Sequence, residues 1–345
     1  MCVKDTGTKY QLWISDFNID GTFTRVHPFI ISHTKTMTRT REDGKEEVFS
    51  ACIKPGDTRY LGGDKSSSIT TIKLQGRPRT GISYDKANEF CANRGDWVTM
   101  IDYLEYCAIQ ALCYIEYANF DNQATLNVNL TSEGFKQGGL GAGVTNLAWD
   151  RLTAFNGKNP IVQTYWTAEH NIGNGSTNGD HYELGNYNTD GSNLNTYPAV
   201  YRGILNFFGD IWTFIRDVVI INKDTNYNSV YLLKKGVNHA DVTVDNINEK
   251  CYLIGDQANS NSFITEFDFR FGPYFIPNKV GTNKKADYNW IRGNNGQDTD
   301  KAVRVLLLGG SAPDGSEAGS DDFYSTWVRS GSSAGVGFFT TVKLD

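Results

Sequence analysis

The last forty or so residues constrain the fold of this chain more than any other stretch. An apolar run at 304–308 predicts a buried strand, and the aromatic and β-branched residues at 336–344 predict a strand that closes the chain. Between them lies a polar stretch rich in glycine, a residue that permits backbone conformations with positive φ. We expect a compact loop held by two strands, and loops on a rigid frame are where binding residues concentrate. The alternative, a disordered Ser/Gly linker, is disfavoured by the apolar strands on both sides.

Charge and hydropathy exclude several classes of function. The 345 residues carry a net charge of −6 and no basic stripe, which argues against nucleic acid as a partner. No run approaches the ~20 apolar residues of a membrane-spanning helix, so no membrane insertion is expected. The N-terminal residues contain no apolar stretch typical of a secretory signal, and we expect no signal peptide.

The cysteines and histidines show no spacing typical of a metal site. Of the six cysteines, Cys91, Cys107 and Cys113 lie in apolar stretches with helical character, which predicts buried free thiols rather than disulfides. The five histidines form no pair four residues apart, as two ligands on one helix face would. We therefore expect no metal ion and no cofactor.

Residues 83–120 contain the most clearly periodic segments. Ser83 and Gly95 predict the start and stop of a first helix. Thr99, followed three residues later by Asp102, resembles the start of a second helix, which is apolar around most of its girth and so is predicted to be buried. Residues 1–80 look rich in strands, strand character returns at 230–234 and 264–271, and 277–300 reads as a polar loop.

Two carboxylates flank the second half of a cluster of aromatic residues at 207–214. Asp210 and Asp217 beside aromatic rings are an arrangement that acid–base chemistry could use. No histidine or cysteine lies at a spacing that supports such chemistry, so turn and cap roles are favoured for both.

Several short segments, taken in order, resemble a known family. They are HPFI at 27–30, ISYDKANEFC at 82–91, IEYANF at 115–120, YRGILNFFGDIWTFIRDV at 201–218, DYNW at 287–290 and LLLGGSAPDGSEAG at 306–319. The ordered set is similar to the C-type lectin fold variable proteins of diversity-generating retroelements, as in phage tail tropism determinants. The formylglycine-generating-enzyme-like branch of that fold looks similar too.

The resemblance implies a fold class and a division of the chain. It implies an α+β protein with the C-type lectin fold, in which two helices pack on small antiparallel sheets and the C-terminal half is long and rich in loops. An N-terminal β extension would cover 1–24. A ligand-binding domain would cover 25–345, with a displayed surface within 286–335.

The resemblance also implies which side chains the displayed surface presents and which support it. The residues expected to be displayed are Tyr288, Asn289, Trp290, Arg292, Ala312, Asp314, Ser316, Glu317, Ser320, Asp321, Asp322, Tyr324, Thr326, Val328 and Arg329. The expected scaffold residues are Gly309, Gly310, Ser311, Gly315, Gly319 and Phe338. Tyrosine and tryptophan give rigid contact area at low entropic cost, whereas serine, asparagine and aspartate adapt their hydrogen bonds.

The chain departs from the family pattern in ways that bear on function. Asp321 and Asp322 look like an insertion before Phe323, so the register of 321–335 against the family is open. The run Ala148-Trp149-Asp150 lacks the middle asparagine of a calcium-dependent sugar site, which needs about 6–8 oxygen ligands. The enzyme branch needs a cysteine pair near the C-terminus, and no cysteine follows Cys251.

The resemblance therefore implies binding and not catalysis. The expected role is that of a receptor-binding protein, on a phage tail or a bacterial cell surface, that recognises a host cell-surface protein or glycan and assembles as a homotrimer. An enzyme on the formylglycine-generating-type fold and a structural virion component stay open as alternatives, since a fold does not fix a function.

Overall fold

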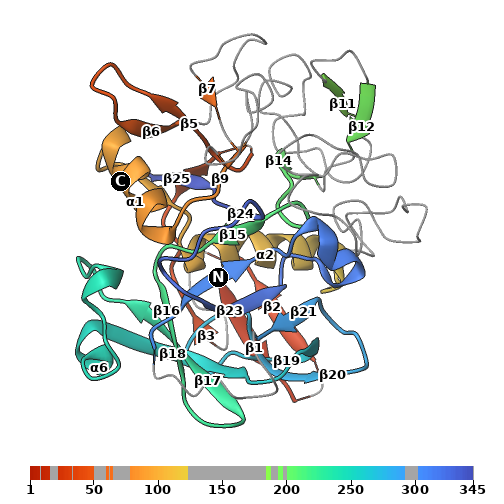
Figure 1. Ribbon diagram of the computed structural model, residues 1–345. Helices are drawn as coiled ribbons and strands as arrows, with labels where there is room; N and C mark the ends of the chain where they lie inside the picture. Colours follow the sequence, from red (N-terminus) through yellow and green to blue (C-terminus); the bar gives the residue numbers. More distant parts are fainter. Residues whose placement is uncertain are drawn as a thin grey trace.

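The computed structural model describes residues 1–7, 9–15, 22–32, 34–49, 60–61, 63–64, 78–122, 184–187, 193–196, 200–291 and 302–344. Strands make up most of the regular structure in these residues, and the largest unit is a sheet of seven strands (Figure 1).

The large sheet is assembled from segments that lie far apart in the chain. Its order is β20-β19-β21-β23-β22-β15-β24. The strands are β15 (Trp212–Phe214), β19 (Ser262–Asp268), β20 (Ile276–Gly281), β21 (Tyr288–Trp290), β22 (Val305–Leu308), β23 (Phe323–Trp327) and β24 (Val336–Gly337). The pairs β21–β23 and β15–β24 are parallel and the other neighbours are antiparallel, so the sheet is mixed.

Strand β22 confirms the predicted buried strand and divides the interior into two hydrophobic cores. Leu306 and Leu308 join the core that contains the tyrosines of helix α2 (Tyr103–Tyr117). Val305 and Leu307 join the core that contains Phe90 of helix α1 (Tyr84–Arg94). Because successive side chains of a strand point to opposite faces, α1 and α2 cover opposite faces of the large sheet.

Both predicted helices are present, and their caps explain where they begin. Helix α1 (Tyr84–Arg94) starts at Ser83, whose hydroxyl accepts a hydrogen bond from the backbone of Lys86, and stops at Gly95, as predicted. Helix α2 (Tyr103–Tyr117) is buried, as predicted, but its capping box is formed by Asp102 and Glu105. The predicted start at Thr99 is wrong because that residue lies in β10 (Val98–Met100), which pairs with the C-terminal strand.

The smaller sheets surround the large one. They contain β1 (Cys2–Asp5), β2 (Tyr10–Trp13) and β3 (Thr22–Phe23); β4 (Phe29–Ile31), β10 and β25 (Thr340–Lys343); β5 (Met37–Thr40), β6 (Glu46–Phe49) and β7 (Tyr60–Leu61); β8 (Gly63–Asp64) and β9 (Arg79–Thr80); β11 (Leu184–Tyr187) and β12 (Asn193–Thr196); β13 (Val200–Tyr201) and β14 (Ile204–Leu205); and β16 (Val218–Asn222), β17 (Tyr227–Leu233) and β18 (Cys251–Ala258). The short helices η2 (His239–Asp241) and α6 (Ile247–Lys250) connect β17 to β18.

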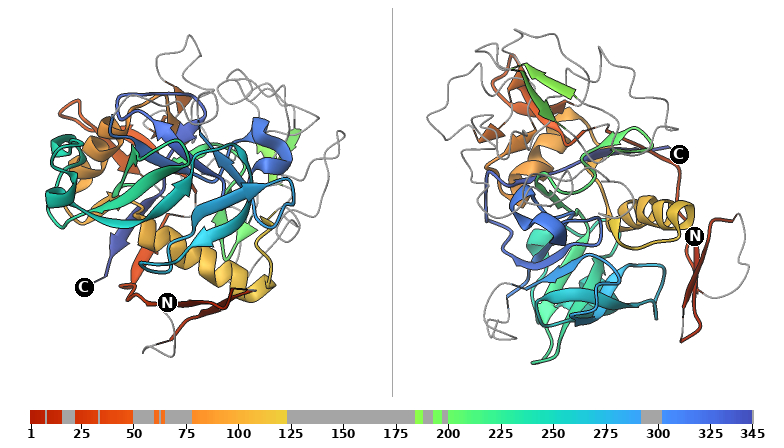
Figure 2. Two further views of the ribbon diagram at one scale, coloured as in Figure 1. Left: turned by 90° about the horizontal axis from the view of Figure 1, so that it is seen from below. Right: turned by 90° about the vertical axis from the view of Figure 1, so that its right-hand side faces the viewer.

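The N-terminal sheet packs against α2 and strand β19 (Figure 2). Its anchor is Tyr10, whose hydroxyl accepts a hydrogen bond from the backbone N–H of Phe267 at 2.9 Å. The Tyr10 ring also makes an edge contact with Phe269, with ring centroids 5.0 Å apart. Met1 and Val3 are buried in the same core as α2.

The predicted fold class is wrong. A seven-stranded mixed sheet with a helix on each face does not fit an α+β C-type lectin fold of two helices on small antiparallel sheets. Two local predictions fail for the same reason. The stretch 277–300, read as a polar loop, contributes to β20 and β21, and the single closing strand at 336–344 is split between β24 and β25, which belong to different sheets.

The structure confirms the predictions for the cysteines and, in part, those for Asp210 and Asp217. Cys91, Cys107 and Cys113 are buried and free, which confirms the prediction of free thiols. Asp217 has a cap role as predicted, because its carboxylate accepts a hydrogen bond from the backbone of Tyr103 at the start of α2, at 2.8 Å. Asp210 instead forms a fully buried ion pair with Lys35, with 2.5 Å between nitrogen and oxygen.

Candidate functional site

Strands β21 and β23 bring the two halves of the expected displayed segment side by side (Figure 1). In their parallel pairing Asn289 lies opposite Phe323 and Trp290 lies opposite Tyr324. The alternation of a strand then separates the side chains, so that Tyr288, Trp290 and Tyr324 are half-buried whereas Asn289 and Phe323 are buried. Trp290 and Tyr324 pack at the edge of the core beneath α1.

Six aromatic residues form two sets of three contacting rings across this part of the large sheet, and the β21–β23 pairing places Trp290 opposite Tyr324. Phe263 contacts Tyr288 with ring centroids 5.2 Å apart, and Tyr288 contacts Trp290 at 4.9 Å. Across the β21–β23 pair, Tyr324 contacts Trp212 at 5.4 Å and Trp327 at 5.9 Å. We call these six residues the aromatic row. Edge-to-face and tilted packing of this kind fixes each ring, so the row is a rigid surface.

The glycine-rich loop after β22 lies next to the row and turns through left-handed conformations. Gly309 and Gly310 have φ values of 97° and 66°, and a Cβ on Gly310 would overlap the carboxylate of Asp322. The loop then forms the short 3₁₀-helix η3 (Ala312–Glu317), which begins with a capping box between Ser311 and Asp314. All six residues expected as scaffold are buried.

The residues expected to be displayed divide into three groups. Ser316 and Val328 are exposed, and Tyr288, Trp290, Glu317, Tyr324 and Thr326 are partly exposed. Asp314 and Arg329 are also partly exposed but have structural partners: Asp314 accepts hydrogen bonds from Ser311, and Arg329 lies 3.5 Å from Asp85 of α1. Arg292 lies outside the described residues.

The expectation of display is wrong for the third group, which comprises Asn289, Ala312, Ser320, Asp321 and Asp322, all of them buried. Asn289 is turned inward because its amide donates to the carbonyls of Ala258 and Ser260, both at 2.9 Å. Ala312 is held by a backbone hydrogen bond to Asp210. The remaining three belong to a polar cluster beneath the loop.

That cluster, which we call the buried acidic cluster, consists of Asp287, Asp321 and Asp322, none more than 1% exposed. Helix α2 reaches it through Gln110, whose amide donates to the Asp321 carboxylate at 2.8 Å and to the carbonyl of Ser320 at 2.9 Å. Asp287 accepts a hydrogen bond from Asn122 at 2.8 Å. Neither carboxylate oxygen of Asp322 has a hydrogen-bond partner among the described residues.

Burial dominates the electrostatics of this cluster. It raises the pKa of Asp287 to about 7, an increase that Lys284 partly offsets. It also raises the pKa values of Asp321 and Asp322 well above their usual range, and the neighbouring carboxylates add to the effect. Buried carboxyls without a cationic partner are held in the protonated form, in which they carry no charge and can donate a hydrogen bond.

A metal ion is not the evident partner of these carboxyls. Within the described ranges, no three His, Cys, Asp or Glu side chains are arranged to hold a metal ion. We therefore interpret the buried acidic cluster as a protonated polar network that ties the glycine-rich loop to α2.

Comparison with known proteins does not identify the chain. No protein-family model matches it, and no curated protein is significantly similar to it. Its function therefore has to be inferred from the geometry of the site. Among the described helices, none has the length and apolar composition needed to cross a membrane.

The sequence reasoning missed half of the aromatic row. Trp327 lies within the stretch expected to be displayed, three residues after Tyr324, and its aromatic character was the available signal. Phe263 and Trp212 come from β19 and β15, and only the pairing of strands far apart in the chain brings them to the row.

Proposed function

We propose that this chain is a non-catalytic binding protein of a phage tail or bacterial surface, whose aromatic row and adjoining loop grip a host cell-surface protein or glycan. The observation that carries the proposal is the aromatic row, in which five rings are partly exposed and Trp212 is buried, with Ser316 and Val328 exposed in the adjoining segments. Aromatic side chains dominate the binding energy of protein interfaces, and their rings also stack on the apolar faces of sugars.

The rigidity of the frame supports this role. The rings stand on hydrogen-bonded strands of the large sheet, so little conformational entropy is lost when a partner binds. The loop beside them is fixed by the Ser311–Asp314 capping box and by the buried acidic cluster. Exposed positions such as Ser316 and Val328 can be substituted without disturbing either core, which suits a surface that adapts to different partners.

The placement of the three most deeply buried carboxyls of the loop region favours binding over acid–base catalysis. An enzyme of that kind places carboxyls with shifted pKa values where substrate can reach them. The carboxyls of the buried acidic cluster lie in the interior instead, where a substrate cannot reach them. A homotrimer, which we include in the proposal, would multiply weak individual contacts through avidity.

The first test adds a bulky charged side chain to the proposed binding surface and leaves the aromatic rings in place. Val328→Arg adds bulk and charge at a side chain that is 41% exposed, so binding of labelled protein to a panel of bacterial cells should weaken at least about tenfold. Leu253→Arg on β18, where the side chain is 39% exposed and outside the row, is the matched control and should bind as the wild type does. Flow cytometry gives the affinity, and circular dichroism checks the fold.

A second variant tests the aromatic contact itself. Trp290→Ala should reduce binding by a similar factor, with Trp97→Ala, which removes an indole that is 57% exposed, as the control. Binding that survives both Val328→Arg and Trp290→Ala would show that another face is used. Binding to no cell in the panel would favour a structural virion component.

A further inference from the structure

A cavity of about 620 Å³ lies at the opposite end of strand β19 from the aromatic row. Its walls come from the N-terminal strand β1 and from the strands β17, β18, β19 and β20. Phe263 of the row and Asp268 of the cavity are five residues apart in β19, which is roughly 17 Å at the rise of a strand. The cavity is therefore a separate place in the molecule, of a volume typical of small-molecule sites.

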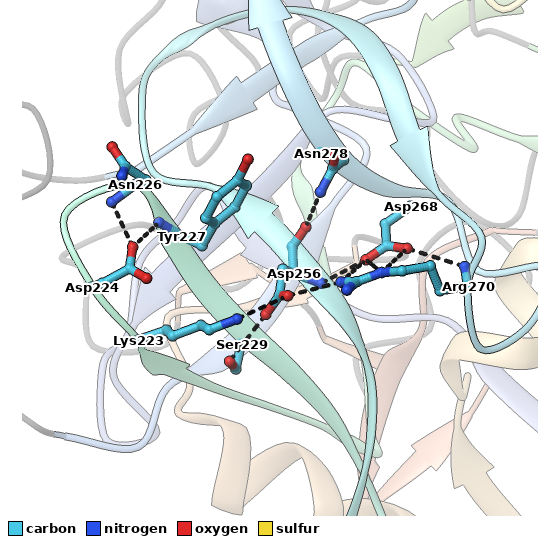
Figure 3. A network of polar contacts seen from close by, with 9 residues as sticks. All are labelled: Lys223, Asp224, Asn226, Tyr227, Ser229, Asp256, Asp268, Arg270 and Asn278. Carbon is cyan, nitrogen blue, oxygen red and sulfur yellow. Dashed lines mark hydrogen bonds and ion pairs between the residues drawn. The ribbon is translucent and has the colours of Figure 1, made fainter. Parts of the chain in front are cut away.

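A network of ion pairs forms one wall of the cavity (Figure 3). The Arg270 guanidinium donates to Asp268 through Nε and Nη2, and Nη2 also donates to Asp256 at 2.7 Å. Lys223 donates to the same oxygen of Asp256 at 3.0 Å, and Ser229 donates to the other oxygen at 3.1 Å. Burial alone would raise the pKa of Asp256, but the hydrogen bonds from Arg270 and Lys223 outweigh it and hold the pKa below its usual value.

The charges that line the cavity nearly cancel. They comprise three cations, Lys4, Lys223 and Arg270, and four carboxylates, Asp5, Asp256, Glu266 and Asp268. A strongly anionic or cationic ligand would have to break existing ion pairs to bind, and separating a partly buried pair is costly. A neutral ligand with many hydrogen-bonding groups meets no such cost, because a hydroxyl can donate to a carboxylate and accept from an ammonium at once.

Two neutral polar groups in the cavity wall have hydrogen-bonding capacity that no described residue uses. The Tyr227 hydroxyl has no hydrogen-bond partner among the described residues, and the Asn278 amide donates to the carbonyl of Asp256 at 3.1 Å while its oxygen accepts nothing there. In Figure 3 both side chains lie on the same side of the network. Val3, Phe267 and Phe269 add apolar surface to the lining.

From this combination we infer that the cavity binds a neutral polyhydroxylated ligand, of the size of one or two sugar rings. The ion pairs supply fixed donors and acceptors, Tyr227 and Asn278 supply open ones, and the apolar lining takes the C–H face of the ring. This site does not depend on the aromatic row or on the function proposed for it.

Direct titration with small sugars tests the inference. Glucose, galactose, N-acetylglucosamine, lactose and maltose are titrated into the full chain and followed by NMR, with sodium phosphate and spermine as charged comparison probes. At least one sugar should bind saturably with a dissociation constant on the order of 1 mM, and the charged probes should not. Binding of only phosphate or spermine, or of nothing, overturns the inference.

Two variants assign the binding to the cavity. Tyr227→Phe keeps the ring and removes the open hydroxyl, so the sugar affinity should fall about fivefold, whereas Tyr252→Phe on the outer surface of β18 should leave it unchanged. Asn278→Trp fills the cavity and should abolish binding, with Leu253→Trp as its control. Sugar binding that survives both Tyr227→Phe and Asn278→Trp places the site elsewhere and refutes the assignment.

Discussion

Two of the groups of buried carboxylates among the described residues are stabilised in opposite ways. In the cavity wall, Asp256 and Asp268 are charged and share Arg270, with Lys223 as a further partner of Asp256. In the buried acidic cluster, Asp321 accepts a hydrogen bond from Gln110, whereas the carboxylate of Asp322 has no hydrogen-bond partner among the described residues. Neither residue forms an ion pair within the described part of the chain. The pKa of Asp256 is accordingly held low, whereas burial raises the pKa values of Asp321 and Asp322.

The difference reflects how far each group lies from solvent. Arg270 and Lys223 keep about half of their side-chain surface exposed, so they bring charge to the carboxylates without being buried themselves. The buried acidic cluster lies between α2 and the loop, where a long cationic side chain would have to be buried as well. Protonation is the less costly solution there, and it makes the anchoring of the proposed binding loop sensitive to pH.

The largest expected effect comes from removing the shared cation of the charged group. Arg270→Ala leaves Asp268, whose side chain is 2% exposed, without its ion pair, and should lower the free energy of unfolding by about 3 kcal/mol at pH 7. Urea denaturation followed by circular dichroism measures the loss.

The conservative variant shows whether charge or shape matters. Arg270→Lys keeps the charge but not the fork-shaped contact, so it should recover part of the loss. If Arg270→Ala cost less than about 1 kcal/mol, the ion pairs would behave like ordinary surface pairs, and the contrast between the two groups would not hold.

A second, smaller effect is the pH dependence of stability. The pKa of Asp287 is about 7 in the folded protein and near 3.9 in an unfolded chain, so between these values the folded state holds a proton that the unfolded state has lost. Rising pH therefore favours unfolding, and the titration of Asp287 should lower the free energy of unfolding by about 1 kcal/mol from pH 6.5 to pH 8.5, where the folded state gives up its proton. Asp217, whose pKa burial raises to about 7, adds to the same trend.

The pH range of this measurement is set by the other titrating groups. Burial lowers the pKa of His239 to about 4, so His239 acts in the opposite direction below pH 6.5. Asp256, with its lowered pKa, contributes stability that is lost only in strong acid. Asp287→Asn should reduce the slope between pH 6.5 and 8.5, and a stability that rises over that range in the wild type would contradict the protonated state of the cluster.

Local signals in the sequence predicted local structure well. Ser83 and Gly95 delimit α1, and the apolar run of β22 is buried, because caps and hydrophobic runs act over a few neighbouring residues. The fold class could not be predicted in this way. The order of the large sheet pairs β15 with β22 and β24, segments about a hundred residues apart, and no local pattern in the sequence reveals which distant strands pair.

The candidate site shows the same limit. The sequence placed Tyr288, Trp290 and Tyr324 together, but Asn289, Ser320, Asp321 and Asp322 were expected to be displayed as well and are buried. Asp321 and Asp322 are charged residue types that are rarely buried, so their inward orientation follows from the loop geometry and not from their chemistry. The cavity escaped prediction because its walls come from residues 3–5 and 223–278, two stretches that look unrelated in the chain.

The last expected effect compares Asp322, whose carboxyl has no ion pair, with Asp256, whose charge is paired. Asp322→Asn replaces a group that burial keeps protonated with a neutral amide of the same shape, so the folded state no longer has to retain a proton at high pH. Relative to the wild type, its free energy of unfolding should rise with pH, and the gain at pH 8 should exceed the change at pH 5 by at least about 1 kcal/mol. Asp256→Asn is the matched control and should be destabilised, because it removes the charge that pairs with Lys223 and Arg270. If Asp322→Asn were less stable than the wild type at pH 8, Asp322 would have to be ionised and paired, and the two groups of carboxylates would then be stabilised in the same way.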